Sequence, residues 1–454
     1  MIRRVSIALT VALVVLISSG PSAAAISPPE VDAVVDPPTG NVGPVQPMAQ
    51  RSPCVVSGVV VGTDPGVVPP NQLSLSLSEA WQHSTGEGQL VAVIDTGVQP
   101  GPRLPNVEAG GDFVEATDGL TDCDGHGTLV AGLIAGQPGA DGFSGVAPNA
   151  RIVSIRQTSE RFSPRDSGED QAEMQAAVDV AALARSVVRA VDLGARVINI
   201  STVTCIPADR NIDQSELGAA LRYAAVDQDV VIVAAAGDAE GGTACKSNPL
   251  TDPARPSDPR NWSGATSVSI PSWWQPYVLS VGSLTPGGQP SPFTMAGPWV
   301  GLAAPGENIT SVSNDAIGGL ANGMPNNEQQ LSPIRGTSYS AAYVSGVVAL
   351  VRSRFPELSA QQVVSRISAT AHTAARSPSN LVGAGSVDPV AALTWQVPAE
   401  PRVDSTAARQ IAAPPPPAPQ DPMPRLVAFA GVGVLAALVL GTLMASAKRK
   451  GRKA

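Results

Sequence analysis

The sequence predicts an α/β protein whose core is a parallel sheet with helices on both faces. Short, continuously apolar runs alternate along the chain with longer amphipathic or small-residue stretches. Strands that are apolar on both sides are typical of a sheet covered on both faces, and the intervening helices supply the crossovers that parallel strands require. The chain has 454 residues, of which 43% are hydrophobic, so it can bury one large core.

The elements of this sheet can be placed from the apolar runs. The expected strands are Leu90–Ile94, Arg151–Ile155, Val197–Ile200, Val230–Ala235, Val278–Val281 and Val300–Ala303. The expected helices between them are Gln171–Leu193 and Ser215–Val226. The charged stretch Gln157–Asp170 has few apolar residues, so we expect an exposed loop that proteases cut first. Ligand sites of parallel sheets lie beyond the carboxyl ends of the strands, so polar residues that follow a strand are candidate site residues.

Two apolar segments near the ends predict export and anchoring. Residues 1–25 contain two arginines, a 13-residue apolar run and three closing alanines, which is the pattern of a signal peptide; an uncleaved anchor is the alternative. Residues 426–447 form an uncharged segment of 22 residues, long enough to cross about 30 Å of hydrocarbon as a transmembrane helix. The basic tail 448–454 predicts a cytoplasmic C-terminus. We therefore expect a globular part on the extracytoplasmic side of the cell membrane.

The rest of the chain divides by its proline content. Residues 26–75 form a proline-rich N-terminal extension without a helical or alternating pattern, so we expect an ordered wrap or a flexible arm instead of a domain. Residues 398–425 contain nine prolines and are predicted to be an extended linker. The globular domain is expected over residues 76–397.

Charge and cysteine content narrow the classes of function. The formal net charge of −9 becomes −16 for residues 26–447, because seven of the 29 basic residues and none of the 38 acidic ones lie in the two ends. Such a balance argues against nucleic-acid binding. Four cysteines in an exported chain predict two disulfides, for which three pairings are possible. Because the chain has no CxxC pair and only three histidines, we expect no metal and no cofactor.

Two residues at the edge of the predicted sheet are candidates for a functional site. His126 lies between Gly125 and Gly127, and because glycine costs about 1 kcal/mol inside a helix, this pattern indicates close approach of another backbone. A purely structural histidine would not need a glycine on each side. Asp95 follows the strand Leu90–Ile94, where a buried acid is costly unless it is hydrogen-bonded; a turn or a helix cap is the alternative role.

A third candidate is Ser338, which follows Gly336 and Thr337 and precedes a stretch rich in small residues. A serine at such a place usually caps a helix. In a tight turn, however, its hydroxyl can meet an imidazole, and the nearby amides can face an oxyanion. Together with Asp95 and His126, it completes a set in which an acid orients a base and the base activates a nucleophile.

The segments around these residues resemble the three active-site signatures of subtilisin-like serine proteases, which have the same Asp, His, Ser order along the chain. The matching segments are Val93–Gly97, Gly125–Thr128 and Gly336–Ser338, and the resemblance extends over about residues 76–396. It implies a subtilisin-like three-layer fold and a serine endopeptidase that acts on protein substrates. In this role Ser338 is the nucleophile, His126 the general base, and Asp95 the group that orients the imidazole.

The outer segments resemble those of the mycosins, a family within the subtilases. The shared features are the signal peptide, the proline-rich extension, the four cysteines, the linker and the C-terminal helix with its basic tail. This resemblance implies a membrane-anchored protease associated with type VII secretion, with the membrane complex of that machinery as a partner. The alternative is a structural stabiliser of that complex whose proteolysis is weak or incidental. A cell-wall binding protein is a third interpretation, supported only by the predicted export.

The resemblance also implies where the substrate binds. Two segments are expected to line the specificity pocket and to pair with the substrate strand: Ser201, Thr202 and Val203, and the backbone of Ala235, Ala236 and Gly237.

Asp238 departs from the subtilase pattern, which has an asparagine at this position whose amide donates to the oxyanion. An ionised carboxylate cannot donate, and the loss of such a donor costs about 10²–10³ in kcat. We expect Asp238 to occupy the oxyanion-hole position and to limit turnover, unless it is protonated or the amide of Asn261 takes its place as donor. The alternative is that Asp238 points away into the following turn.

We expect the disulfides Cys54–Cys123 and Cys205–Cys245. Cys205 and Cys245 follow two consecutive strands, and parallel neighbours would bring both to one edge of the sheet. Cys54 would then join the extension to the His126 motif, which agrees with the mycosin resemblance. Because the extension is too rich in proline to form a packed domain, we do not expect it to act as an inhibitory folding propeptide.

Overall fold

The computed structural model describes most of the chain between the predicted signal peptide and the basic tail. The described residues are 26–166, 170–240, 244–255, 257–326, 328–373, 378–398 and 423–450. The predicted signal peptide (1–25), most of the predicted linker (399–422) and residues 451–454 lie outside the described residues.

Within the described residues, nine strands form the central sheet, in the order β16-β17-β11-β10-β8-β6-β2-β4-β3. Every pair of neighbours is parallel except β16 and β17. The strands are β2 (Leu90–Asp95), β3 (Val107–Asp112), β4 (Arg151–Arg156), β6 (Val197–Ile200), β8 (Val231–Ala235), β10 (Val278–Leu284), β11 (Val300–Pro305), β16 (His372–Thr373) and β17 (Gly385–Ser386). All six predicted strands are therefore confirmed, with end points that differ by at most three residues.

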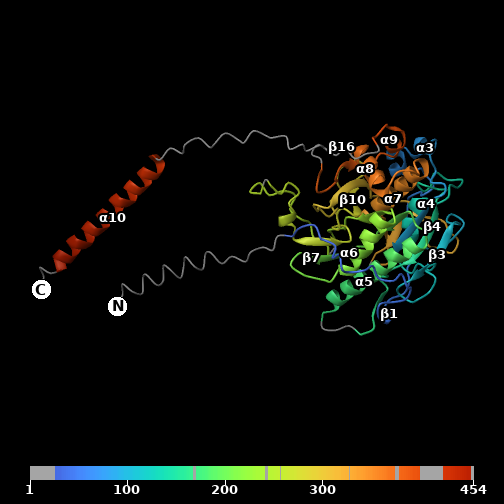
Figure 1. Ribbon diagram of the computed structural model, residues 1–454, viewed down its shortest axis with the longest axis horizontal. Coiled ribbons are helices and arrows are strands. Elements are labelled where there is room, and N and C mark those ends of the chain that lie inside the picture. The colour runs from blue at the N-terminus through green and yellow to red at the C-terminus, as the bar shows by residue number, and fades with distance from the viewer. Residues whose placement is uncertain are drawn as a thin grey trace. The chain divides into compact units, whose positions relative to one another are not determined.

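Alternate side chains of the sheet enter two separate cores, which confirms the three-layer arrangement. In β2, Val91 and Val93 belong to one core, whereas Leu90, Ala92 and Ile94 belong to the other. The first core is closed by α4 (His126–Ala135), α7 (Thr337–Arg354), α8 (Ala360–Ala369) and α9 (Pro389–Thr394), and the second by α5 (Gln171–Asp192) and α6 (Ser215–Arg222) (Figure 1). Successive side chains of a strand point to opposite faces of the sheet, so the apolar strands contribute to both cores.

Smaller elements surround this sandwich. Four two-stranded antiparallel sheets pair β1 (Met48–Gln50) with β5 (Phe162–Pro164), β7 (Thr204–Pro207) with β9 (Ser267–Ile270), β12 (Ser311–Val312) with β13 (Leu320–Ala321), and β14 (Gly323–Pro325) with β15 (Leu331–Pro333). The short helices are α2 (Pro70–Ser74), α3 (Leu77–Ala80), a π-helical turn (Tyr223–Asp227) that continues α6, and a 3-10 turn (Trp262–Gly264).

The N-terminal extension, residues 26–75, is an ordered wrap over the globular part. Its only regular elements are β1 and α2, and it has no core of its own. It is held by β1 on β5, by the Ser57 amide on Asn314 Oδ1 at 2.9 Å, and by a β-bridge between Gly58 and Gly323. The extension therefore obtains its order from partners that are distant in the sequence.

The expectation of an exposed loop over Gln157–Asp170 is wrong for its first half. Gln157, Ser159 and Phe162 are buried, and β5 lies in this stretch paired with β1 of the extension. The local composition is that of a loop, but the extension covers it, which removes its backbone from solvent. Residues 157–164 therefore do not offer the exposed backbone that a preferred cleavage site needs, whereas Arg165, Asp166 and Asp170 are exposed.

Both disulfides have the predicted pairing. Cys54 is bonded to Cys123 across 69 positions of sequence, and Cys205 to Cys245 across 40. The first joins the extension to the chain just before α4, and the second joins β7 to the segment that follows β8.

The C-terminal helix α10 (Met423–Lys450) belongs to a separate unit of the chain. It covers the predicted membrane span 426–447. By length and hydropathy, no helix among the described residues is sufficient to cross a bilayer. The transmembrane assignment of residues 426–447 therefore stays a prediction.

Candidate active site

The first half of the site is a pair formed by Asp95 and His126. Asp95 is the last residue of β2 and is fully buried, and His126 is the first residue of α4. Asp95 Oδ1 lies 2.7 Å from His126 Nδ1 and also accepts a hydrogen bond from the Thr96 amide. Burial lowers the pKa of His126, but the charge and hydrogen bond of Asp95 more than offset this and raise the pKa to about 9.

Glycines allow α4 to begin directly against the chain that follows β2. Gly125, the residue before the helix, has a φ of 77°, a left-handed conformation that glycine adopts without strain. A Cβ on Gly127 would lie 2.0 Å from the carbonyl oxygen of Gly97. This close approach places the imidazole of His126 on Asp95, and it confirms the interpretation of the flanking glycines.

Asp122 is a further organising residue that sequence reasoning missed. Its carboxylate accepts hydrogen bonds from Thr96 Oγ1, from the amides of Asp124, Gly125 and Thr128, and from Thr128 Oγ1. It thereby joins the turn after β2 to the first turn of α4. Burial raises its pKa to about 6. An acid placed just before a helix start is the sequence signal that could have indicated this role.

Ser338 is the second residue of α7 and lies at the same edge of the sheet. Its Oγ donates a hydrogen bond to the carbonyl oxygen of Ser201 at 3.0 Å, and no bond to His126 is formed within the described residues. The ring of the next residue, Tyr339, lies 5.4 Å from the His126 ring. The serine–histidine bond of a substrate-free site is often loose and tightens when substrate binds.

Ser338 and His126 line one cleft with a volume of about 630 Å³. Of the residues predicted to contact substrate, Ser201, Thr202, Val203 and Gly237 line this cleft. Ala235 and Ala236 do not line it: both are buried, and the Ala236 amide donates to Val281 inside the sheet. Of this second segment, Gly237 is the residue that reaches the cleft, because Ala235 still belongs to β8 and Ala236 is bonded to the neighbouring strand β10.

Asp238 also lines the cleft, beside the nucleophile loop. Its Oδ1 accepts hydrogen bonds from the Thr337 amide at 2.9 Å and from Thr337 Oγ1 at 2.8 Å. Burial raises the pKa of Asp238, and the bonds from Thr337 offset part of this rise. The carboxylate thus faces the residue that precedes Ser338 instead of the turn that follows it in the sequence.

No metal site is indicated in the described parts of the chain. There, no three His, Cys, Asp or Glu side chains are grouped in a way that could hold a metal ion. The arrangement of acid, imidazole and hydroxyl around one cleft is instead suited to nucleophilic attack on a carbonyl carbon.

Comparisons with known proteins point to the same chemistry. Residues 86–385 match the Subtilase family. Mycosin-3 of Mycobacterium tuberculosis is 67% identical over 423 residues, which cover 92% of each chain. The solved structure of the MycP3 protease from the type VII (ESX-3) secretion system aligns with a TM-score of 0.80 at 70% identity, covering 82% of this chain and 100% of that one. A chain of an intact ESX-5 inner membrane complex aligns with a TM-score of 0.80 at 46% identity, covering 93% and 100%.

We predict that Gly127→Ala lowers the melting temperature and separates His126 from Asp95, because the new methyl group would overlap the carbonyl oxygen of Gly97. Overpacking of a buried contact typically costs about 1–3 kcal/mol. Gly319→Ala is the matched control, since the Cβ that it adds meets no atom within 4 Å. Thermal unfolding of the two variants beside the wild type checks this, and equal melting temperatures for all three would contradict it.

Proposed function

We propose, from the premise that this chain belongs to the mycosin family of subtilisin-like serine proteases, that Asp95, His126 and Ser338 are its catalytic triad. The observation that carries the proposal is the 2.7 Å contact of buried Asp95 with His126, in a cleft that Ser338 shares.

The proposed reaction is peptide-bond hydrolysis through an acyl-enzyme. His126 Nε2 removes the proton of Ser338 Oγ as the oxygen attacks the scissile carbonyl carbon, and the imidazolium then gives that proton to the leaving amine. Asp95 holds the tautomer with the proton on Nδ1 and stabilises the imidazolium. A water molecule repeats the sequence and releases the acid. The Ser338 amide, one of the first amides of α7 and so without an acceptor inside the helix, is the proposed donor to the oxyanion.

We further propose that the protease acts on the extracytoplasmic side of the cell membrane, in association with the type VII secretion membrane complex. The support is the relative that is part of the ESX-5 inner membrane complex, together with the predicted signal peptide. In this proposal residues 426–447 form the single-pass anchor, with the C-terminus in the cytoplasm. A mainly structural role in that complex is the second candidate, and the same relative favours it equally.

Ser338→Ala separates the two candidate functions. We expect a fluorophosphonate to label the wild-type chain and not Ser338→Ala, and we expect Ser338→Ala to leave substrates of the protease unprocessed in cells. Ser353→Ala is the control and should be labelled like the wild type, because Ser353 is a half-buried serine of the same helix whose hydroxyl donates to the Glu87 carbonyl.

The same variants are then used to complement a strain that lacks the protein. Secretion restored by Ser338→Ala would show that the structural role suffices for transport. Labelling of Ser338→Ala equal to that of the wild type would contradict Ser338 as the nucleophile.

We predict that the labelling rate rises with pH through the alkaline range. The base form of His126 is the neutral imidazole, and because Asp95 raises the pKa to about 9, this form appears only as the pH rises through that value. Asp95→Asn removes the charge, so the midpoint should move down toward the ordinary histidine value and the maximal turnover should fall by about 10⁴. Rate–pH profiles of both proteins check this; a wild-type midpoint at or below that of Asp95→Asn would contradict it.

We predict that Asp238→Asn raises kcat on a peptide substrate with little change in KM. The asparagine oxygen can accept both bonds from Thr337, while its amide nitrogen replaces a negative oxygen with a donor that acts mainly in the transition state. If Asp238 is instead a protonated donor, wild-type activity should fall as pH rises through its raised pKa, and Asp238→Asn should remove that fall. Equal rates for both proteins at every pH would place Asp238 outside the oxyanion hole.

A further inference from the structure

We propose that Asp179 makes the cleft select polypeptides with a basic side chain a few residues N-terminal to the scissile bond. This inference rests on the proposed protease function, because it assigns the substrate class of the same cleft. Asp179 lies in α5, on the face of the sheet opposite to α7, and its side chain lines the cleft.

Three hydrogen bonds and the peptide link between Ser201 and Thr202 connect the nucleophile to the backbone of Asp179. Ser338 Oγ donates to the Ser201 carbonyl at 3.0 Å, and the next residue, Thr202, donates through Oγ1 to Gln157 Oε1 at 3.1 Å. Gln157 Nε2 in turn donates to the Asp179 carbonyl at 3.0 Å. In this proposal the segment Ser201–Val203, which is expected to pair with the substrate strand, binds the substrate residues N-terminal to the scissile bond. Asp179 borders the same cleft next to Gln157, the partner of Thr202.

The Asp179 carboxylate has only neutral partners. Its Oδ1 accepts from Thr158 Oγ1 at 3.3 Å and from Gln175 Nε2 at 3.0 Å, and no arginine, lysine or histidine of the described residues pairs with it. Burial raises its pKa to about 6. A partly desolvated carboxylate that faces a substrate cleft without a cation is stabilised by a cation that the substrate brings.

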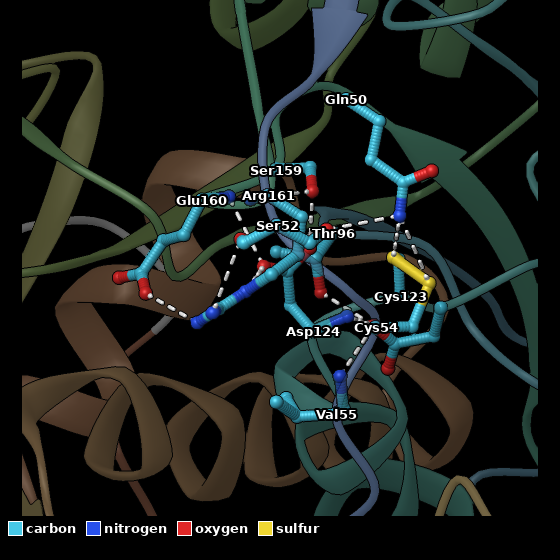
Figure 2. Close-up of polar contacts among 12 residues, drawn as sticks. Gln50, Ser52, Cys54, Val55, Thr96, Cys123, Asp124, Ser159, Glu160 and Arg161 are labelled. Carbon is cyan, nitrogen blue, oxygen red and sulfur yellow. Dashed lines mark hydrogen bonds and ion pairs between the residues drawn. A yellow bond between two sulfur atoms is a disulfide. The ribbon is translucent and has the colours of Figure 1, made fainter. Parts of the chain in front are cut away.

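The other charged residues on this wall of the cleft are already paired. Arg161 contacts Asp124 at 3.3 Å and Glu160 at 3.4 Å, while Ser159 donates to the second oxygen of Asp124 (Figure 2). On the far side, Arg335 lies 3.4 Å from Glu240. Asp124 and Glu160 therefore share one arginine, whereas the hydrogen-bond partners of the Asp179 carboxylate are both neutral.

A purely structural role predicts different behaviour. If Asp179 serves only to hold Thr158 and Gln175, an asparagine can accept the same bonds, and the charge of the substrate will not matter. The two roles therefore differ in how the rate depends on substrate charge, and not in whether the protein folds or reacts.

The experiment uses the full chain and peptidyl phosphonates that label Ser338, so that slow turnover does not limit it. In a series of these peptides, arginine occupies each position before the phosphonate in turn. For each member of the series, a second peptide has glutamine at the same position. We expect one position at which arginine labels about tenfold faster or more, the scale of one charge-assisted hydrogen bond. Asp179→Asn should abolish this preference with the glutamine peptides unaffected, and Asp179→Lys should favour glutamate instead.

Glu160→Gln is the matched control. Its side chain is 83% exposed at the rim of the same cleft, and the arginine preference should survive this change. Three outcomes would each overturn the inference. The wild type could show no arginine preference, the preference could survive in Asp179→Asn, or Asp179→Asn could slow the labelling by all peptides equally. The proposed protease function fails separately, if a plain fluorophosphonate leaves Ser338 unlabelled.

Discussion

The hydrogen bond between Asp95 and His126 depends on how closely α4 approaches the chain that follows β2. A helix with an ordinary side chain at position 127 would stand further from Gly97, and the imidazole would no longer reach the carboxylate at the end of the strand. Asp122 holds the two segments together as well, because its carboxylate accepts hydrogen bonds from Thr96 after β2 and from Thr128 in α4. The site is thus assembled by backbone contact, and this contact determines where the proposed catalytic side chains lie.

The central fold could be predicted from the sequence because its signals are local. Continuous apolar strands, glycines around His126 and the acid after β2 each indicate their role within a few residues. The edge strand β3 gave no such signal: four of its six residues are exposed or glycine, and it forms a strand because β4 lies beside it. The same holds for β5, whose partner β1 is more than a hundred residues earlier in the chain.

The functional side chains divide in the same way. Asp95, His126 and Ser338 lie in short sequence signatures, so each could be identified without knowing that the fold brings them to one cleft. Asp179 has no signature: it is one acid on a charged helix, and it becomes notable only because Gln157 and Thr202 connect it to the wall of the cleft. Ala235 and Ala236 show the reverse error, since adjacency to Gly237 in sequence does not bring them to the surface of the cleft.

The route of the extension fixes when it can join the structure. A ribosome makes residues 26–75 early, yet the groups that hold Ser57 and Gly58 belong to Asn314 and Gly323, which are made some hundreds of residues later. Contacts of such long sequence separation form slowly, because loop closure must precede any gain from them. The first segment of this globular part to be synthesised is therefore among the last to be placed.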